Sequence, residues 1–345
     1  DTFCQYAMVA ADQAMADADF NLEKTDLNRF GVVVTSGIGG MNVFYDEVKS
    51  FVEGTGVPRF NPFFITKMIT DLAAGNISIR HGLKGPNYAT VSACASSTNA
   101  IIDGYMLIKM GYADAMMVGG AEAAINQVGI GGFNAMKALS ENNDNFETAS
   151  RPFDQTRDGF VMGEGAGALI IEDYEHAVNR GATIYAELVG IGMTGDAYHI
   201  SAPQPEGVGA QASMTQALNY ADIQAEQLSY LNLHGTGTPK NDEMEAQAVF
   251  NLCGDSVLAS STKRLTGHTL GAAGAIEAGL CWLVLNNKTT DYVIPENKNN
   301  GTVDPTIAPL NLSAGQQVEN MSFCLSNSFA FGGSNISLIL GKSFE

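Results

Sequence analysis

Seven of the nine residues in the stretch 271–279 are glycine or alanine, and this run lies closely behind Lys263 and His268. Glycine is a poor helix former, and such small side chains gain little free energy from burial. The run therefore needs a physical reason other than side-chain burial. Any fold assigned to this chain must explain why its smallest residues gather behind a lysine and a histidine.

Short apolar stretches alternate with stretches of helical periodicity over most of the chain. Residues 29–40 predict a buried strand that runs into a glycine-rich turn, and residues 63–83 predict a helix. Residues 87–94 predict a strand, 96–114 a helix and 115–123 another strand. Such alternation is typical of an α/β fold with buried sheets.

Two distant segments resemble each other. Residues 163–172 (GEGAGALIIE) and 331–340 (FGGSNISLIL) are both glycine-rich turns that lead into an apolar strand. Each lies near the end of one half of the chain, which indicates a duplicated α/β unit. We expect one half at residues 1–180 and the other at 181–345, packed as one body because no low-complexity linker separates them.

Composition and charge limit the partners. The 345 residues are 45% hydrophobic and 16% charged, which is enough for a large buried core. The net charge of −19 argues against nucleic acid or an anionic membrane as the main partner, because both need a basic surface. An acidic partner that docks on a local basic patch stays possible.

Cysteine usage indicates the compartment. The five cysteines are scattered along the chain without any CxxC spacing, which is typical of thiols in a reducing cytoplasm. No stretch is long and apolar enough to span a membrane, and no signal peptide is visible. We therefore expect a cytoplasmic protein.

Cys94 follows the predicted strand and opens the predicted helix. The N–H groups at the start of a helix favour a thiolate, and the small neighbours Ser92, Ala93 and Ala95 leave room for a substrate. A cysteine can equally be a small core residue. On this stretch alone, the nucleophilic and the structural interpretation are equally supported.

Two of the five histidines lie at junctions between predicted elements. His234 ends an apolar strand at the loop that starts with Gly235, and His268 precedes the small-residue run. Together with Cys94 they form a plausible set of nucleophile and acid–base groups. His81, His176 and His199 lie among mixed residues, where a surface or structural role is the default.

Three other kinds of site are less well supported. A zinc site needs closely spaced cysteine and histidine ligands, and no such spacing occurs. A serine hydrolase needs a GxSxG elbow, which is absent. The stretch GEGAGA resembles a phosphate-binding loop only loosely, because it lacks the lysine–hydroxyl ending and the acidic residue of a dinucleotide site.

Four sequence motifs together indicate which protein family the chain resembles. They are VSACASS (91–97), HGTGTPKNDEMEAQAV (234–249), STKRLTGHTLGAAGAIEAG (261–279) and NSFAFGGSNISLIL (327–340). Their order and spacing resemble the β-ketoacyl-[acyl-carrier-protein] synthases, the elongating condensing enzymes of bacterial type II fatty acid synthesis. The resemblance covers the whole chain and is strongest to the synthase II branch.

The resemblance implies a thiolase-like α/β fold with five layers, α-β-α-β-α, built from two duplicated halves. In that fold the helix after His268 and the helix that begins at Cys94 are counterparts that meet at the centre, and only small side chains let them approach closely. Family members begin with a further strand, glycine turn and helix. The resemblance therefore implies that this N-terminal segment is missing here.

The resemblance also implies a two-stage reaction. An acyl group passes from the thiol of the carrier protein to Cys94, and malonyl-carrier then loses CO₂ and attacks the acyl thioester. The imidazole N–H groups of His234 and His268 would stabilise the enolate. The backbone N–H groups of Cys94 and Phe331 would form a second hole for the tetrahedral intermediate.

Further positions match supporting residues of the family. Lys263 and Glu277 match a buried pair of the family, and a buried lysine needs such a partner. The role implied for this pair is to hold His268 in place and to maintain the local electrostatic field. Asp242 and Glu245 match supportive carboxylates, although charges at a helix start are nearly as plausible. Substrate-binding positions implied by the resemblance are Ile38, Gly129, Phe133, Thr236, Thr238, Phe329 and the gating Phe331, which the loop 195–201 faces.

The resemblance implies an acyl carrier protein as partner, docked on a patch that includes Lys109 and Lys137. It implies no metal and no resident cofactor, because phosphopantetheine arrives on the carrier. It also implies a homodimer in which the strand at 115–122 pairs with its copy, since such an apolar edge would otherwise promote aggregation.

Related functions stay open. A ketosynthase of a polyketide or aryl-polyene system shares the HGTGT motif. A non-catalytic chain-length partner subunit would lack the nucleophile, whereas Cys94 is present. A degradative thiolase would need a second catalytic cysteine, and Cys324 does not match that position; a priming synthase would carry asparagine in place of His268.

Overall fold

A computed structural model describes residues 1–286, 294–297, 302–318 and 321–342. The chain forms two compact units, each assembled from separate segments. The first unit comprises Asp1–Met136, Gly163–Thr183 and Thr269–Ala275, and the second comprises Lys137–Met162, Ile184–His268 and Ile276–Glu345. Each unit therefore contains more than one stretch of sequence, and the division near residue 180 stays a prediction.

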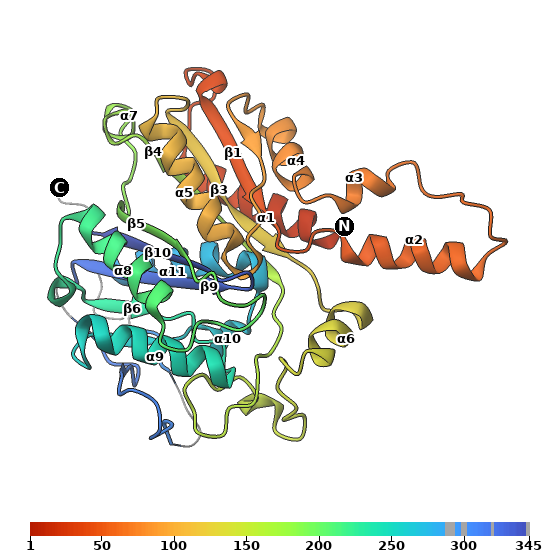
Figure 1. The fold of residues 1–345 in the computed structure, drawn as a ribbon. Coiled ribbons are helices and arrows are strands. Elements are labelled where there is room, and N and C mark those ends of the chain that lie inside the picture. Colours follow the sequence, from red (N-terminus) through yellow and green to blue (C-terminus); the bar gives the residue numbers. More distant parts are fainter. Residues whose placement is uncertain (287–293, 298–301, 319–320, 343–345) are drawn as a thin grey trace. The chain divides into compact units, whose positions relative to one another are not determined.

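The first unit contains a four-stranded sheet in the order β2-β1-β3-β4, of which β1, β3 and β4 are labelled in Figure 1. β1 (Phe30–Thr35) pairs in parallel with β2 (Asn87–Tyr88) and with β3 (Ala115–Glu122). β4 (Gly165–Glu172) pairs with β3 in the antiparallel direction. β1 and β3 are buried along their whole length, as the apolar runs predict.

Helices cover both faces of this sheet because its side chains alternate. Val32 and Val34 lie in one core cluster with residues of α1 (Thr2–Ala18) and α4 (Leu72–His81). α5 (Ser96–Lys109) packs on β3 with its glycine at 104, where a Cβ atom would lie 2.3 Å from Val118 Cγ1.

The expected dimer contact through residues 115–122 is wrong. β3 pairs with β1 on one side and with β4 on the other, so its backbone hydrogen-bonding groups are already used. Within the described part of the chain, the outer strands of this sheet are β2 and β4. A strand in the middle of a sheet has no free edge for a second protomer.

The single helix expected at residues 63–83 is interrupted. α3 (Phe64–Met68) ends at Ile69, whose ψ of 141° is extended, and α4 begins again at Leu72. α3 and the preceding α2 (Met41–Glu53) form a segment that projects away from the sheet of the first unit (Figure 1).

The second unit contains a six-stranded sheet in the order β5-β10-β9-β6-β7-β8, of which β5, β6, β9 and β10 are labelled in Figure 1. Neighbours among β6, β7, β8 and β9 pair in parallel, whereas β10 pairs antiparallel with β9 and β5. The bounds are β5 Glu187–Gly195, β6 Tyr230–Asn232, β7 Leu258–Ser260, β8 Asn311–Leu312, β9 Phe323–Ala330 and β10 Ser334–Gly341.

Helices also lie on both faces of the second sheet. α8 (Val208–Ala221) and α9 (Pro239–Cys253) share a core cluster with Leu231 and Leu325. The opposite face carries a second cluster, in which Cys281 of α11 (Ala273–Leu285) packs with Tyr230 and Cys324. Neighbouring residues of one strand therefore enter different cores.

The repeated glycine-rich segments occupy corresponding places, as the sequence predicts. Residues 165–172 form β4, which is antiparallel to β3, and residues 334–341 form β10, which is antiparallel to β9. In each unit the neighbouring strands towards the sheet centre are parallel. The two sheets thus share a pattern that supports a duplicated α/β unit.

The remaining elements are short. Their bounds are α6 Gln127–Ala135, α7 Tyr174–Asn179 and α10 Lys263–Thr266, with 3-10 helices η1 Leu27–Arg29, η2 Ala93–Ala95, η3 Phe146–Thr148, η4 Ala225–Gln227 and η5 Leu270–Ala272.

Among the described residues, no helix combines the length and apolar character needed to cross a bilayer.

Close backbone packing explains the run of small residues. A Cβ atom on Gly274 would lie 1.8 Å from Thr98 Oγ1, and one on Gly271 would lie 2.2 Å from the backbone nitrogen of Gly37. The N–H of Ala275 donates to Ser97 Oγ at 3.0 Å. The start of α11 at Gly274 therefore approaches the start of α5, and Gly271 of η5 approaches Gly37, so closely that a methyl group at either glycine would overlap a neighbour.

This packing predicts opposite effects for two glycines of the same helix. Gly274→Ala should destabilise the protein by about 1–3 kcal/mol, because overpacking a tight core forces its neighbours apart. Gly279→Ala, where the nearest atom to a Cβ is Trp282 Nε1 at 3.7 Å, should leave stability unchanged or raised by up to about 1 kcal/mol. Urea unfolding measures both, and equal effects would contradict the packing.

Candidate active site

Cys94 comes after β2, which ends at Tyr88, so the strand expected over residues 87–94 is wrong beyond that residue. Cys94 is in η2, directly before α5, and is 9% exposed. The preceding Ala93 has φ 49°, a left-handed conformation that costs non-glycine residues of the order of 1 kcal/mol. Leu270 has φ 47° at the matching point of η5, ahead of α11. The two halves therefore repeat the same turn.

Serine and asparagine side chains hold this turn. Ser96 Oγ donates to the carbonyl of Ala93 at 2.7 Å and accepts the N–H of Ser92 at 2.9 Å. Asn99 Nδ2 donates to Ser92 Oγ at 2.6 Å. These contacts stabilise the strained backbone, so Cys94 is presented in the first turn before a 14-residue helix.

Glu122 is a buried carboxylate that the sequence analysis missed. It ends β3 at 0% exposure and accepts from Ser36 Oγ at 2.6 Å. It also accepts the backbone N–H groups of Gly37, Ile38 and Gly271 at 2.9, 3.2 and 3.0 Å. Burial raises its pKa, and these donors oppose that effect. The available signal was a carboxylate at the end of an apolar strand.

The first unit contains three of the predicted acyl-pocket residues. Ile38 is held by Glu122 through its N–H, and Gly129 belongs to α6. A Cβ atom on Gly129 would lie 2.0 Å from the carbonyl oxygen of Ala124, so the backbone turns tightly there. Phe133 is half-buried on the same short helix.

His234 and His268 lie side by side in the second unit. Both are 2% exposed, and their ring centroids are 5.4 Å apart at an interplanar angle of 86°. The backbone N–H of His268 donates to the carbonyl of Val161 at 2.7 Å. Within the part of the chain that is described, His234 Nδ1 has no hydrogen-bond partner. The structure thus brings the two predicted imidazoles together.

Burial and the nearby Lys263, which pairs with Glu277, both affect the charge of these imidazoles. Lys263 Nζ contacts Glu277 Oε1, and the two side chains are 1% and 3% exposed. Burial lowers the pKa of His234 well below its ordinary value, and the charge of Lys263 lowers it further. The same two causes lower the pKa of His268. Both rings are therefore neutral at physiological pH.

Two carboxylates in the first turns of α9 hold the loop after His234. Glu245 accepts the N–H groups of His234 and Gly235, each at 2.7 Å. Asp242 accepts the N–H of Gly237 at 3.2 Å. Burial raises the pKa of Glu245 to about 7 and also raises that of Asp242. Both carboxylates, predicted as supportive, thus bond to the loop backbone.

The predicted pantetheine-binding hydroxyls lie on this loop. Thr236 Oγ1 and Thr238 Oγ1 are 2.9 Å apart, and the N–H of Thr238 donates to Thr236 Oγ1 at 3.3 Å. Thr236 is 6% exposed, and Thr238 is the N-cap residue of α9. The two hydroxyls therefore form a small polar pair directly after His234.

The predicted gate lies between β9 and β10. Phe329 is 5% exposed with its ring centroid 5.9 Å from that of His234, whereas Phe331 is 36% exposed. Gly332 has φ 89° and donates its N–H to the carbonyl of Ile200 at 2.8 Å. The turn thus contacts the loop 195–201, which the sequence predicts to face it.

The predicted docking lysines are both at the surface, on different units. Lys109 ends α5 and lies 5.5 Å from the ring of Tyr105. Lys137 is in the second unit with its side chain 79% exposed, 3.8 Å from Glu141. Their role in docking stays a prediction.

These groups support covalent acyl chemistry. Cys94 is a buried thiol at the start of a helix, where backbone N–H groups attract negative charge. The two neutral imidazoles can donate hydrogen bonds to an oxygen that gains charge during a reaction. Among the described residues, no group of three or more histidine, cysteine, aspartate or glutamate side chains could hold a metal ion.

Sequence comparisons match the chain along its whole length. A family profile described as beta-ketoacyl synthase, N-terminal domain, matches residues 1–177, and the corresponding C-terminal domain profile matches residues 185–297. The chain is 46% identical to the 3-oxoacyl-[acyl-carrier-protein] synthase 2 of Staphylococcus aureus, over 100% of this chain and 82% of that protein.

Two solved structures have the same fold. A beta-ketoacyl synthase from Burkholderia phymatum superposes with a TM-score of 0.91 at 35% identity, over 100% of this chain and 83% of that one. A type II polyketide ketosynthase in complex with its acyl-carrier protein superposes with a TM-score of 0.92 at 29% identity, over 99% of this chain and 85% of that one.

The clamp on His234 predicts a pH-dependent effect of Glu245→Gln. Near pH 5 Glu245 is protonated in the folded protein, and each of its two oxygens can still accept one N–H. The amide replaces one oxygen by an NH₂ group that cannot accept, so the variant should be less stable by about 1–3 kcal/mol. Folding raises the pKa of Glu245 from 4.5 to about 7, so its contribution to wild-type stability is full below 4.5 and is lost as pH rises through 7. The difference between variant and wild type should therefore shrink with rising pH, by about 1.4 kcal/mol per unit in that window.

Urea unfolding at several pH values measures this difference. Glu243→Gln, at an exposed position of the same helix, is the matched control and should follow the wild-type curve. A difference that grows with pH would mean that Glu245 is ionised throughout and that its raised pKa is wrong.

Proposed function

Because the chain belongs to the beta-ketoacyl synthase family, we propose that it condenses an acyl thioester with malonyl-[acyl-carrier-protein]. The product is 3-oxoacyl-[acyl-carrier-protein], formed through an acyl-cysteine intermediate during fatty acid elongation. The observation that carries this proposal is the pair of neutral imidazoles of His234 and His268, whose ring centroids are 5.4 Å apart. The buried ion pair of Lys263 and Glu277 lies near them. The similarity to the staphylococcal synthase supports the same reaction.

The first stage transfers the acyl group. The Cys94 thiolate attacks the thioester carbonyl carbon, a new C–S bond forms, and the pantetheine thiolate leaves and takes up a proton. The developing oxyanion accepts hydrogen bonds from the backbone N–H groups of Cys94 and Phe331. This assignment is supported by the position of Cys94 at a helix start and needs no charged base.

The second stage breaks the bond between the malonyl methylene carbon and its carboxylate. CO₂ leaves, and the electron pair moves into an enolate whose oxygen accepts hydrogen bonds from His234 and His268. The enolate carbon then attacks the acyl carbonyl, and Cys94 leaves as a thiolate. Neutral imidazoles suit this role, because they donate without adding a fixed charge to the ground state.

The remaining predicted residues act on binding. Thr236 and Thr238 hold the pantetheine amides, and Lys109 and Lys137 attract an acidic carrier to this acidic protein. No resident cofactor is required, because phosphopantetheine arrives on the carrier. The residues predicted to bind the acyl chain stay Ile38, Gly129, Phe133, Phe329 and Phe331.

The alternative of a polyketide or aryl-polyene ketosynthase is not favoured. Identity is 46% to the staphylococcal 3-oxoacyl-[acyl-carrier-protein] synthase 2 and 29% to the polyketide ketosynthase. A non-catalytic chain-length partner subunit is disfavoured by the presence of Cys94 in its helix-start turn. Condensation assayed with saturated acyl-carriers and with polyketide intermediates separates these functions.

Substitutions should separate the nucleophile from the histidines. Cys94→Ala should abolish acyl transfer and condensation. His234→Ala and His268→Ala should each lower malonyl decarboxylation by about 10²–10³-fold, the typical effect of losing one oxyanion donor. Acyl transfer should change far less, because the backbone N–H groups stay in place. Radiolabelled acyl-carrier measures loading, and CO₂ release measures decarboxylation.

The opposite pattern would reverse the assignment. Slow acyl loading with normal CO₂ release in either histidine variant would make that histidine the base that activates Cys94. Normal condensation by Cys94→Ala would overturn the covalent mechanism.

We also propose a homodimer, with its contact at the segment of α2 and α3 and not at the strand 115–122. In the segment of α2 and α3, Phe60 and Phe64 have ring centroids 5.4 Å apart, and Phe44 is 6.3 Å from Phe64. Phe44, Phe60 and Phe63 are nevertheless 49%, 39% and 65% exposed. A contiguous exposed aromatic surface typically marks a protein interface.

Phe63→Ser should therefore weaken the dimer, with a shift towards monomer in light scattering at micromolar concentration. Val178→Ser, a comparably exposed apolar residue at 52% on α7, is the control and should leave the assembly unchanged. A wild-type protein that is monomeric under these conditions would contradict the proposal.

A further inference from the structure

We propose that Arg157 is a positioning residue for the malonyl stage of condensation. It fixes the loop that follows His234 by joining that loop to two other segments of the second unit. The inference rests on the proposed function, since it assigns a residue to one stage of the same reaction. Arg157 itself does not contact the histidine rings in any of the hydrogen bonds or ion pairs described for it.

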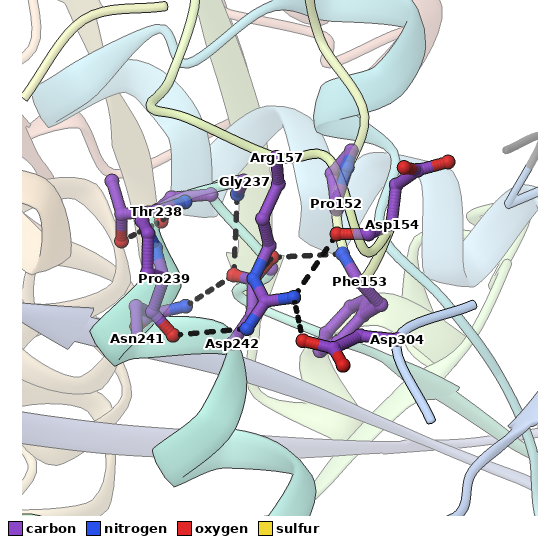
Figure 2. Close-up of polar contacts among 12 residues, drawn as sticks. Pro152, Phe153, Asp154, Arg157, Gly237, Thr238, Pro239, Asn241, Asp242 and Asp304 are labelled. Atoms are coloured by element: carbon purple, nitrogen blue, oxygen red, sulfur yellow. Dashed lines mark hydrogen bonds and ion pairs between the residues drawn. The ribbon is translucent and has the colours of Figure 1, made fainter. Parts of the chain in front are cut away.

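The guanidinium of Arg157 lies at the centre of the contacts in Figure 2. Nη1 donates to the carbonyl of Asp154 at 3.0 Å and to Asp304 Oδ2 at 2.6 Å. Nη2 donates to the carbonyl of Pro239 at 3.3 Å, and Nε lies 3.7 Å from Asp242 Oδ2. One side chain thus contacts the segment 152–157, the start of α9 and the segment 302–306.

Asp242 connects this guanidinium to the loop after His234. Its Oδ2 accepts the N–H of Phe153 at 2.8 Å, and its Oδ1 accepts the N–H of Gly237 at 3.2 Å. The carboxylate is 0% exposed, and Arg157 is the cation that pairs with it. Without that cation, a buried charge at Asp242 would be uncompensated, and the two N–H contacts would weaken.

Asp304 holds Arg157 from the other side. The hydrogen bond from the Thr306 hydroxyl, followed by that from Arg157, lowers the pKa of Asp304 to about 2. The N–H of Asp304 donates to the carbonyl of Phe153 at 2.9 Å. The N–H of Gln155 donates to the carbonyl of Thr302 at 3.0 Å. Asp304 is therefore charged at neutral pH and keeps the guanidinium oriented.

The loop itself leaves little tolerance for movement. The N–H of Gly159 donates to the carbonyl of Gly237 at 3.1 Å, and Gly237 has φ 84°. The loop begins at His234 and carries Thr236 and Thr238. A shift of this loop would move the proposed enolate donor and the pantetheine hydroxyls together, and a misplacement of about 1 Å can lower a rate 10²-fold.

Stability alone does not explain this arrangement. Buried ion pairs are often no more stabilising than well-packed apolar residues of similar volume. Within the described residues, Arg157 Nε also has no hydrogen-bond acceptor, so the network is not fully satisfied. The planar guanidinium of Arg157 contacts three backbone segments at once and therefore fixes the position of the loop after His234. The ammonium group of a lysine cannot make the same set of contacts.

Arg157→Lys and Arg157→Gln test this role by comparing the two partial reactions. Both variants should slow CO₂ release from malonyl-carrier by about 10- to 100-fold and raise its KM, because the loop after His234 is displaced. Acyl loading of Cys94 should stay within about 2-fold of wild type, since its proposed donors are backbone N–H groups. Asp304→Asn should show the same selectivity with a smaller effect, and it keeps the test open if Arg157→Gln fails to fold.

Arg151→Lys is the matched control. Arg151 lies on the same segment with a side chain 9% exposed, and within the described part of the chain its hydrogen bonds reach residues 148, 149, 156 and 158. It should lower both partial reactions equally or leave both unchanged. If the Arg157 variants also lost both partial reactions in parallel with unfolding, Arg157 would be purely structural and the inference wrong. Failure of the wild-type protein to form 3-oxoacyl product would instead overturn the proposed function.

Discussion

The arrangement of the first unit depends on a backbone contact that leaves no room for side chains. Gly271 of η5 meets Gly37, and Gly274 at the start of α11 meets Thr98, at distances that exclude a Cβ atom. This contact places η5 against η2, the turn that carries Cys94. Close-packed interiors tolerate little change in volume, so the position of the nucleophile follows from the smallest residues of the chain.

Buried carboxylates also fix loops within each unit. Glu122, Glu245 and Asp242 each accept backbone N–H groups from loop residues, and Glu277 pairs with Lys263. Removing a carboxylate from water is costly, so such groups persist where they hold a specific geometry. Burial, together with the positive charge of Lys263, lowers the pKa of both imidazoles and keeps them neutral, which is the protonation state that the enolate stage requires.

Strands with a clear apolar pattern were predictable from the sequence. A strand that buries polar side chains, such as β9, was not. β1, β3 and β10 follow from runs of valine, methionine and isoleucine. β9 was missed because Ser326, Asn327 and Ser328 interrupt its apolar residues, although all three are buried. Asn327 Nδ2 donates to Glu245 Oε1 at 3.4 Å, a partner 82 residues away that no local pattern reveals.

The sequence by itself determined the α/β class, the duplication and the identity of the chemical groups, because periodicity and motif spacing are local properties of a chain. Only the tertiary structure decided that residues 115–122 are a central strand, that Glu122 binds three separate loop N–H groups, and that Arg157 joins three segments. Those features depend on contacts between residues far apart in sequence, and such contacts exist only once the chain has packed.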